Sequence, residues 1–399
     1  PSPGGNGLIR RGLDLYRIWL DTARKRQAGE TAVWTESSDS PTSFGDLYQR
    51  CEANRKEKRF QKWNGRVVAI QMRNSAQWIE AFLTCQAVGA IPMPVEDDLP
   101  SEALERILSS VRPCAVWQEA SITERATSVQ RKPACLVKLT SGSTGLPNPI
   151  FFTDDQMIAD GRQILSTMGI RGGDRNLAVI PFGHSYGLGN LIMPLILQGT
   201  SLAIAATPFP HTVSAVAKAS GATVFPAVPT LLNGLLRAEI SVDDLSTLRL
   251  LISAGSPISP SNAQAFRERF GKRVHNFYGA SETGGIAFDR TGEDTLTGEA
   301  AGTPLDGVTL SRSATGRLLV SSNAVFTRYN RRRLGRNGAC LLADLTELRS
   351  DGAVILKGRT ARQIKLGGKR LALAEVEQEF KQIAGVHEVF VSGYQDQHG

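Results

Sequence analysis

Residues 140–145 (Thr-Ser-Gly-Ser-Thr-Gly) have the composition of a phosphate-binding loop: four hydroxyl side chains and two glycines directly follow the mostly apolar segment Cys135–Leu139. Glycine lets a backbone approach a ligand closely, and successive N–H groups in such a turn form an anion-binding concavity. Ser and Thr hydroxyls add donors. No Lys-Ser or Lys-Thr pair follows Gly145, so the run is not a Walker-type loop. Taken by itself, it fits a polar surface turn equally well.

A second run, residues 276–285 (Asn-Phe-Tyr-Gly-Ala-Ser-Glu-Thr-Gly-Gly), places an aromatic ring, a hydroxyl and a carboxylate close together at the end of a predicted strand. A nucleotide site needs a flat apolar face for the base and a hard oxygen ligand for Mg²⁺ beside the phosphates. Tyr278 and Glu282 supply these two groups. The two runs together favour a nucleotide site over two unrelated turns.

A third run combines Gly358–Arg359 with residues 363–370 (Gln-Ile-Lys-Leu-Gly-Gly-Lys-Arg) and 375–377 (Glu-Val-Glu). The order and spacing of the three runs resemble the adenylate-forming superfamily of acyl-CoA synthetases, aryl-acid ligases, peptide-synthetase adenylation domains and luciferases. Further matching segments are residues 67–72, 74–75 and 87–94, the adenine-side turn 253–257 (Ser-Ala-Gly-Ser-Pro), and Asp344. The resemblance extends from about residue 40 to the C-terminus.

The resemblance implies a site for ATP, released as AMP, and for Mg²⁺. Residues 140–145 would hold the β- and γ-phosphates, with Thr144 and Glu282 serving the metal. Tyr278 would stack on adenine, Asp344 would accept from both ribose hydroxyls, and Arg359 would contact ribose or phosphate. For Asp344 the alternative is an ordinary strand-end Asp, since the family's Thr-Gly-Asp appears here as Leu-Ala-Asp. The predicted nucleotide-binding residues are Thr140, Ser141, Gly142, Ser143, Thr144, Gly145, Ser256, Tyr278, Gly279, Ala280, Ser281, Asp344 and Arg359.

His184 lies in residues 181–189 (Pro-Phe-Gly-His-Ser-Tyr-Gly-Leu-Gly), between a predicted strand and a predicted helix. A lone His is more often structural, but the resemblance places His184 at the acyl-pocket entrance. We prefer this gating role to that of a general base, because an ionised carboxylate needs no base. With Thr144 and Glu282, His184 completes the predicted catalytic set. The predicted acid-binding residues are His184, Tyr186, Gly187, Ala254 and Gly255.

The substrate class follows from Gly183. Amino-acid-activating relatives carry an Asp there to pair with the substrate ammonium, and burying an unpaired ammonium is costly. Amino acids are therefore disfavoured. The His-Ser-aromatic-Gly-Leu run looks most like fatty-acyl ligases, with aryl acids as the second choice.

The resemblance implies a second half-reaction, in which the thiol of CoA, or of the phosphopantetheine on an acyl carrier protein, displaces AMP. The predicted thiol-side loop contains Lys365, Gly367 and Gly368. Five arginines lie close together at 328, 331, 332, 333 and 336. A solvated loop is the favoured interpretation, with docking of CoA phosphates or an acidic carrier protein as the alternative. Nucleic-acid binding is disfavoured because only Tyr329 could stack on a base.

Four positions depart from the family pattern. Asn148 stands where a phosphate-loop Lys is expected, Pro149 where Gly is usual, Ala361 at a hinge that is usually Asp or Lys, and Arg317 in place of a Glu. These changes should weaken ATP binding and alter domain rotation. The leading hypothesis is an ATP-dependent carboxylic acid ligase. Its rival is a degenerate, non-catalytic member that binds nucleotide or acyl ligand and acts as a partner protein.

Composition bounds these expectations. The chain has 399 residues, 41% of them hydrophobic, and a net charge of +8. The length exceeds one ordinary domain, and the charge suits nucleotide, CoA or an acidic carrier protein without choosing among them. Five scattered cysteines indicate reduced thiols in a cytoplasmic protein. The longest apolar stretch, residues 188–206, is interrupted by Gly, Asn and Gln, and no secretory signal is present, so no membrane span is predicted.

Apolar runs alternate with helical patterns from about residue 66, which predicts an α/β fold with mostly parallel sheets. Strands are expected at 67–71, 115–117, 136–139, 176–180, 201–204, 223–225, 250–252 and 274–277. Helices are expected at 77–88, 101–111, 155–168, 211–219, 229–237 and 261–270, with Ser75 and Ser101 as N-caps.

We expect a large multi-layer N-terminal domain over residues 1–357, with a small β-subdomain at about 302–357. The resemblance implies that residues 358–399 begin a small, mobile C-terminal domain that is incomplete here and lacks the segment carrying the family's catalytic Lys. We therefore expect this chain to fold and to bind an acyl-adenylate analogue, but to form adenylate slowly.

Overall fold

The structure of the chain is a computed structural model. It describes residues 14–36, 41–126, 134–140, 148–326, 328–329, 338–359, 363–366, 369–373, 376–377, 380, 382–383, 385–386 and 389–391. Within this part of the chain, no helix is both long and apolar enough to cross a membrane.

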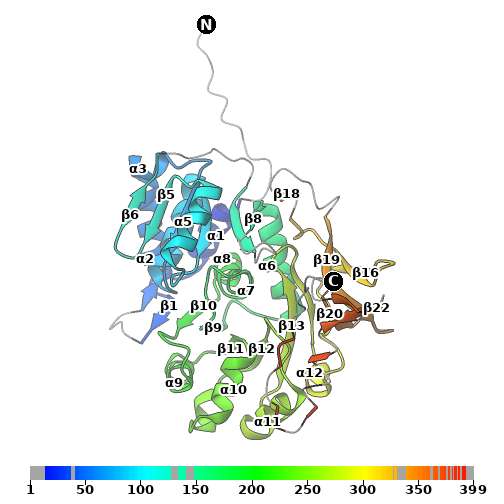
Figure 1. Cartoon of the computed structure of the whole chain (residues 1–399). Helices are drawn as coiled ribbons and strands as arrows, with labels where there is room; N and C mark the ends of the chain where they lie inside the picture. The colour runs from blue at the N-terminus through cyan, green and yellow to red at the C-terminus, as the bar shows by residue number, and fades with distance from the viewer. Residues whose placement is uncertain are drawn as a thin grey trace.

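A nine-stranded sheet in the order β15-β14-β13-β12-β11-β9-β10-β1-β2 forms the centre of the molecule (Figure 1). Its strands are β1 (Thr31–Thr35), β2 (Thr42–Ser43), β9 (Arg175–Ala178), β10 (Ser201–Ile204), β11 (Val224–Ala227), β12 (Leu250–Ser253), β13 (Val274–Ala280), β14 (Gly284–Phe288) and β15 (Thr303–Pro304). Pairing is parallel from β1 through β10, β9, β11 and β12 to β13, while β2, β14 and β15 pair antiparallel. The predicted mostly parallel α/β fold is confirmed.

Smaller sheets flank this centre. A four-stranded sheet has the order β4-β3-β5-β6, from β3 (Val67–Gln71), β4 (Ile91–Val95), β5 (Ala115–Gln118) and β6 (Ile122–Glu124). A three-stranded sheet joins β7 (Leu136–Thr140), β8 (Asn148–Phe152) and β18 (Arg328–Tyr329). The strands β7 and β8 are antiparallel neighbours, with Thr140 opposite Asn148.

The predicted strand-and-turn region is an antiparallel sheet of β16 (Thr309–Arg312), β17 (Arg317–Ser321), β19 (Ala339–Leu348) and β20 (Val354–Arg359). A separate hairpin pairs β21 (Gln363–Leu366) with β22 (Lys369–Ala372). The domain boundary after residue 357 stays a prediction.

The helices cover the sheets, and several of them begin at a side-chain N-cap. They are α1 (Leu15–Lys25), α2 (Phe44–Lys56), α3 (Lys58–Gln61), α4 (Ala76–Val88), α5 (Ser101–Val111), α6 (Asp154–Met168), α7 (Ser185–Gly187), α8 (Met193–Gln198), α9 (Pro210–Ser220), α10 (Pro229–Arg237), α11 (Pro260–Phe270) and α12 (Glu293–Thr297), with a π-helix η1 (Leu188–Ile192) and a 3₁₀-helix η2 (Val242–Leu245). The predicted cap Ser75 accepts a 3.0 Å hydrogen bond from the backbone N–H of Trp78. The other predicted cap was wrong: Pro100, with φ −55° and ψ 141°, occupies that position without a side-chain hydrogen bond, and Ser101 is already the first helical residue.

Candidate functional site

The predicted site segments gather beyond the carboxyl ends of the parallel strands of the central sheet. Residues 181–187 follow β9, residues 254–256 follow β12, and residues 278–282 complete β13 and its turn. In open α/β sheets this edge is where ligands bind. Ser185 Oγ donates a 3.0 Å hydrogen bond to Ser281 Oγ, so the acid-side segment and the nucleotide-side turn are in direct contact.

The turn that carries Glu282 is closed by the β13–β14 hairpin. Ala280 lies opposite Gly284, and the N–H of Thr283 donates to the carbonyl of Ala280 at 3.2 Å. The Glu282 carbonyl accepts from the N–H of Phe326 at 3.1 Å, which ties the turn to the segment after β17. Tyr278, at the start of this region, is half-buried against the main core. The turn is therefore held by backbone contacts on both sides.

The Glu282 side chain can serve a metal ion. It is half-exposed, and within the described part of the chain its carboxylate has no hydrogen-bond or ion-pair partner. Among the same residues no group of three or more His, Cys, Asp or Glu side chains could hold a metal. A single carboxylate fits Mg²⁺, which usually keeps several waters and binds through one or two carboxylates and substrate phosphates. The charge of Glu282 also reaches β19, where burial, and then this carboxylate, raise the pKa of Cys340 to about 11.

Asp344 on β19 is the register partner of Arg359, the last residue of β20. Asp344 is only 9% exposed, and a carboxylate has the acceptor capacity for two neighbouring hydroxyls. Arg317, one of the departures from the family pattern, donates to the carbonyls of Leu342 at 2.7 Å and Leu341 at 3.1 Å. It thus braces β19 immediately before Asp344. The structure brings Asp344 and Arg359 together at one end of this sheet, and their nucleotide roles stay predictions.

His184 is the N-cap of α7 and lies exposed at the surface of the site. Its Nδ1 accepts a 3.3 Å hydrogen bond from the N–H of Tyr186, which places the proton of the neutral ring on Nε2. Packing around the ring lowers the pKa of His184 below 6.5, with the Glu96 carboxylate opposing this shift and the Lys138 charge adding to it. This shift favours the neutral imidazole, which presents an uncharged ring to a ligand.

Asn74 holds the segment before His184. Its Nδ2 donates to the carbonyl of Ile180 and its Oδ1 accepts from the N–H of Phe182, both at 2.8 Å. The residue was noticed in the sequence only as part of a matching segment. Its place directly after β3, at the carboxyl end of a parallel strand, is the signal that could have assigned it this role.

Close packing explains two glycines of the acid-side segment. A Cβ added at Gly183 would lie 2.7 Å from Cβ of Pro94, and one at Gly187 would collide with the carbonyl of Pro181. There is accordingly no space at Gly183 for the Asp that amino-acid-activating relatives carry.

Tyr186 lies deeper than its predicted acid-binding role suggests. The residue is buried, its hydroxyl donates to the carbonyl of Ile252 at 3.4 Å, and its ring centroid is 5.7 Å from that of Phe277. Burial raises its pKa well above 10.0. Of the other predicted acid-side residues, Ala254 is buried and Gly255 is exposed with a φ of +89°, which favours glycine. Ser256 next to it is exposed.

Only two residues of the predicted phosphate loop and thiol-side loop lie in described strands. Thr140 ends β7 opposite Asn148, and Lys365 pairs with Arg370 in the β21–β22 hairpin. The remaining predicted phosphate-loop and thiol-loop residues, and most of the arginine cluster, lie outside the described residues. They are Ser141, Gly142, Ser143, Thr144, Gly145, Gly367, Gly368, Arg331, Arg332, Arg333 and Arg336.

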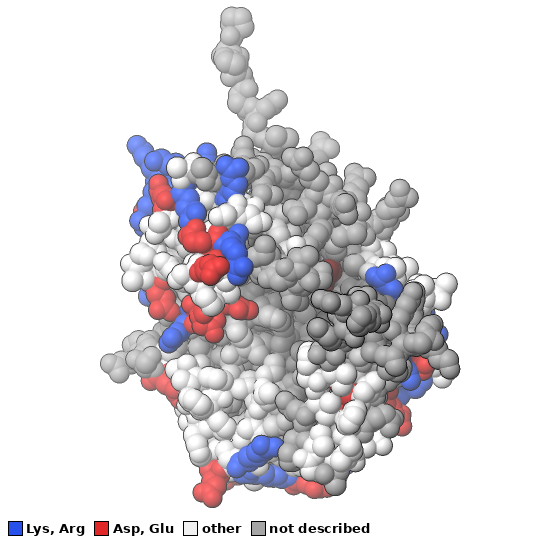
Figure 2. All heavy atoms as spheres, in the orientation of Figure 1, with Lys and Arg blue, Asp and Glu red and all other residues white. Residues whose placement is uncertain are grey.

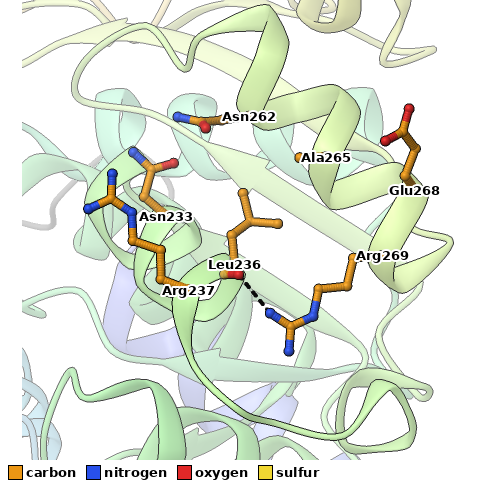
Figure 3. A pocket seen from close by; sticks show the side chains of 7 residues that line it. All are labelled: Asn233, Leu236, Arg237, Asn262, Ala265, Glu268 and Arg269. Atoms are coloured by element: carbon orange, nitrogen blue, oxygen red, sulfur yellow. Dashed lines mark hydrogen bonds between the residues drawn. The ribbon is translucent and has the colours of Figure 1, made fainter. Parts of the chain in front are cut away.

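A groove of about 460 Å³ lies elsewhere, between α10 and α11 (Figure 3). Its lining consists of Asn233, Leu236, Arg237, Asn262, Ala265, Glu268 and Arg269, and includes none of the predicted site residues. The Arg269 guanidinium donates to the carbonyls of Leu236 and Ala238 at the end of α10, so it caps that helix. On the face shown in Figure 2, basic and acidic side chains of the described residues are interspersed.

Comparison with known proteins identifies the family of the chain. A family model described as AMP-binding enzyme matches residues 20–137 and 117–329. A probable CoA ligase of Humulus lupulus is 26% identical over 342 residues, covering 78% of this chain and 62% of that protein. A feruloyl-CoA synthase of an Amycolatopsis species is 26% identical over 280 residues, covering 66% of this chain and 57% of that protein. The chain thus spans less than two thirds of the length of either relative.

A solved structure shares the fold. The o-succinylbenzoate coenzyme A synthetase of Bacillus subtilis, in complex with AMP, superposes with a TM-score of 0.83 at 21% sequence identity. The match covers 95% of this chain and 86% of that structure. At this identity the likeness establishes the architecture alone.

Proposed function

Because the chain belongs to the AMP-binding enzyme family, whose model matches more than half of it, we propose that it is an AMP-forming acid–thiol ligase. In the first step a carboxylate oxygen of the substrate attacks the α-phosphorus of ATP, and the bond to the β-phosphate breaks to release pyrophosphate. In the second step a thiolate attacks the acyl carbon of the adenylate and AMP leaves, which gives a thioester. The acid, ATP and the thiol are thus all substrates.

The observation that carries this proposal is the Ser185–Ser281 hydrogen bond at 3.0 Å. A ligase must bring the acid and the α-phosphate together, and phosphoryl-type chemistry depends on positioning and charge stabilisation. His184 precedes Ser185, and Glu282 follows Ser281. The contact between their neighbours supports the proposal that the acid gate and the metal ligand act in one site.

Each role in the site extends this proposal. Tyr278 offers its ring to adenine, while Asp344 and Arg359 receive ribose and phosphate. Glu282, with Thr144 of the 140–145 loop, is assigned to Mg²⁺, which supplies charge neutralisation for the phosphates. Lys365 belongs to the thiol-side hairpin.

The acid is proposed to lack an α-ammonium group, because no acidic side chain fits at Gly183 to pair with one. A neutral His184 at the gate suits an apolar acid. A fatty acid is the first candidate from the residues of the acid-side run. An aryl acid is the second candidate, and the names of the feruloyl-CoA and o-succinylbenzoate relatives support it.

CoA is the proposed thiol, since the three relatives described above are all named as CoA-using enzymes. A carrier-protein phosphopantetheine is the alternative acceptor. We also propose that the protein works in the cytoplasm, supported by five cysteines that are all buried and form no disulfide.

Pyrophosphate exchange into ATP, measured with the full-length protein across fatty, aryl and amino acids, tests the proposal. The expected result is exchange that depends on added acid, followed by thioester formation when CoA is supplied. Absence of acid-dependent exchange, together with retained nucleotide binding, would instead support the non-catalytic partner protein.

A further inference from the structure

A buried ion pair lies behind the candidate site. Lys138 Nζ on β7 is 4.0 Å from Asp160 Oδ2 on α6, and the two side chains are 1% and 4% exposed. The Lys138 ammonium also lies 4.5 Å from the centroid of the Phe152 ring. Removing two charges from water is energetically costly, and apolar residues of similar volume often give equal or greater stability. A buried pair next to a predicted site therefore suggests a role beyond packing.

Asp160 touches the turn that carries Glu282. The N–H of Gly285 donates a 2.9 Å hydrogen bond to Asp160 Oδ1. Gly284 has a φ of +73°, and a Cβ there would overlap the same carboxylate. The two glycines thus pack directly against the Asp160 carboxylate, and only Thr283 separates them from Glu282. Asp160 sets where the C-terminal side of this turn lies.

Lys138 belongs to the strand that leads into the predicted phosphate loop. It pairs with Ile150 across β7 and β8, and Thr140, the last residue of the strand, follows two residues later. Its charge acts on the site. Desolvation lowers the pKa of Lys138, while the carboxylates of Asp160 and Glu282 counteract this shift. In turn the Lys138 charge lowers the pKa of His184.

We propose that Lys138 and Asp160 are a positioning pair for the metal–triphosphate part of the site. The ion pair joins β7 to the turn that carries Glu282, and so fixes the proposed metal ligand relative to this strand. This inference rests on the proposed nucleotide site. Lys138 and Asp160 should therefore strengthen the binding of MgATP but not that of AMP, because AMP lacks the β- and γ-phosphates.

The double variant Lys138→Met/Asp160→Asn tests the proposal. It removes both charges without leaving either one buried alone, and the introduced amide oxygen can still accept from Gly285. Calorimetric titration is expected to show at least tenfold weaker MgATP binding, AMP binding within threefold of the wild type, and a similar melting temperature. The matched control is Arg249→Met/Asp174→Asn, which removes an ion pair near the opposite ends of the strands and should change neither affinity.

The outcomes are distinguishable. Unchanged MgATP binding, or equal weakening of MgATP and AMP, would overturn the positioning role while leaving the proposed function intact. If the wild type binds neither nucleotide, the proposed function fails and the pair's role with it. Should the double variant not fold, Asp160→Glu keeps both charges but lengthens the side chain that meets Gly285. It should likewise weaken MgATP and spare AMP, and wild-type MgATP binding by it would contradict the proposal.

Discussion

The hydroxyl of Ser185 donates a hydrogen bond of 3.0 Å to the hydroxyl of Ser281, across a sequence separation of 96 residues. One such bond contributes only about 0.5–1.5 kcal/mol, so it marks the proximity of two segments more than it creates it. The proximity itself comes from β9 and β13, which run parallel in one sheet and end at the same edge. The predicted acid gate and the predicted metal-ligand turn are neighbouring segments for that reason.

Replacement of Glu282 by Gln should impair adenylation. The substitution keeps the shape of the side chain but removes the charge proposed to hold Mg²⁺. We expect acyl-adenylate formation to fall at least tenfold, which corresponds to about 1.4 kcal/mol or more, and to require more Mg²⁺ for half-maximal rate. Glu239→Gln, at an exposed position of the chain, is the control and should be silent. Unchanged adenylation in Glu282→Gln would remove this carboxylate from the mechanism.

The acid specificity should exclude amino acids. Gly183 contacts Pro94 too closely to be replaced by a counter-ion for an α-ammonium. In the pyrophosphate-exchange assay, an acid should therefore give a higher kcat/KM than its α-amino derivative of equal chain length. A panel in which an amino acid is the best substrate would show that the acyl-pocket argument is wrong.

Asn74→Ala should destabilise the segment that leads to the predicted acid-binding residues. The variant loses both 2.8 Å hydrogen bonds to the segment 180–182 and leaves a backbone N–H and a carbonyl unpaired. We expect the free energy of unfolding to drop by about 1–3 kcal/mol, and KM for the acid to rise more than KM for ATP. Gln77→Ala is the control, since this exposed neighbour makes one 2.8 Å bond to the carbonyl of Glu119. Equal increases in both KM values would argue against a specific acid-side role.

His184 predicts a pH dependence of stability. Its pKa is lowered below 6.5 in the folded state, so the unfolded state binds the proton more readily. The wild type should therefore lose stability relative to His184→Asn as the pH falls below about 6.5, and the difference should be constant above that value. Asn preserves an acceptor for the N–H of Tyr186 at the N-cap. Melting temperatures of both proteins across this range check the sign, and a relative gain by the wild type in acid would contradict it.

Local patterns predicted much of the fold. The bounds of β3, β10, α5 and α10 coincide with the predicted ranges, because each is a clear apolar run or helical stripe between breakers. The short strand β1 was not predicted. It owes its place to parallel pairing with β10, a partner far along the chain that a local pattern does not reveal.

Local patterns also predicted the candidate site only in part, because they do not reveal contacts between distant segments. The glycine and hydroxyl motifs predicted which segments matter, and the structure brings the described ones among them to one edge of the sheet. The π-helix Leu188–Ile192 has no simple sequence signature. Tyr186 shares its motif with His184, yet it is buried while His184 is exposed, and at Gly187 the backbone passes so close to the carbonyl of Pro181 that a Cβ would collide with it. Lys138 interrupts an apolar strand, but only the folded chain shows that Asp160 is its partner.

The most direct measurement is a calorimetric titration of this chain with AMP and with a non-hydrolysable acyl-adenylate analogue. The wild type is expected to bind both saturably. Asp344→Asn should bind each at least tenfold more weakly, a loss of about 1.4 kcal/mol, while the exposed control Asp306→Asn should match the wild type. A folded wild type that binds neither ligand, or an Asp344→Asn variant that binds both as well as the wild type, would contradict the proposed nucleotide site.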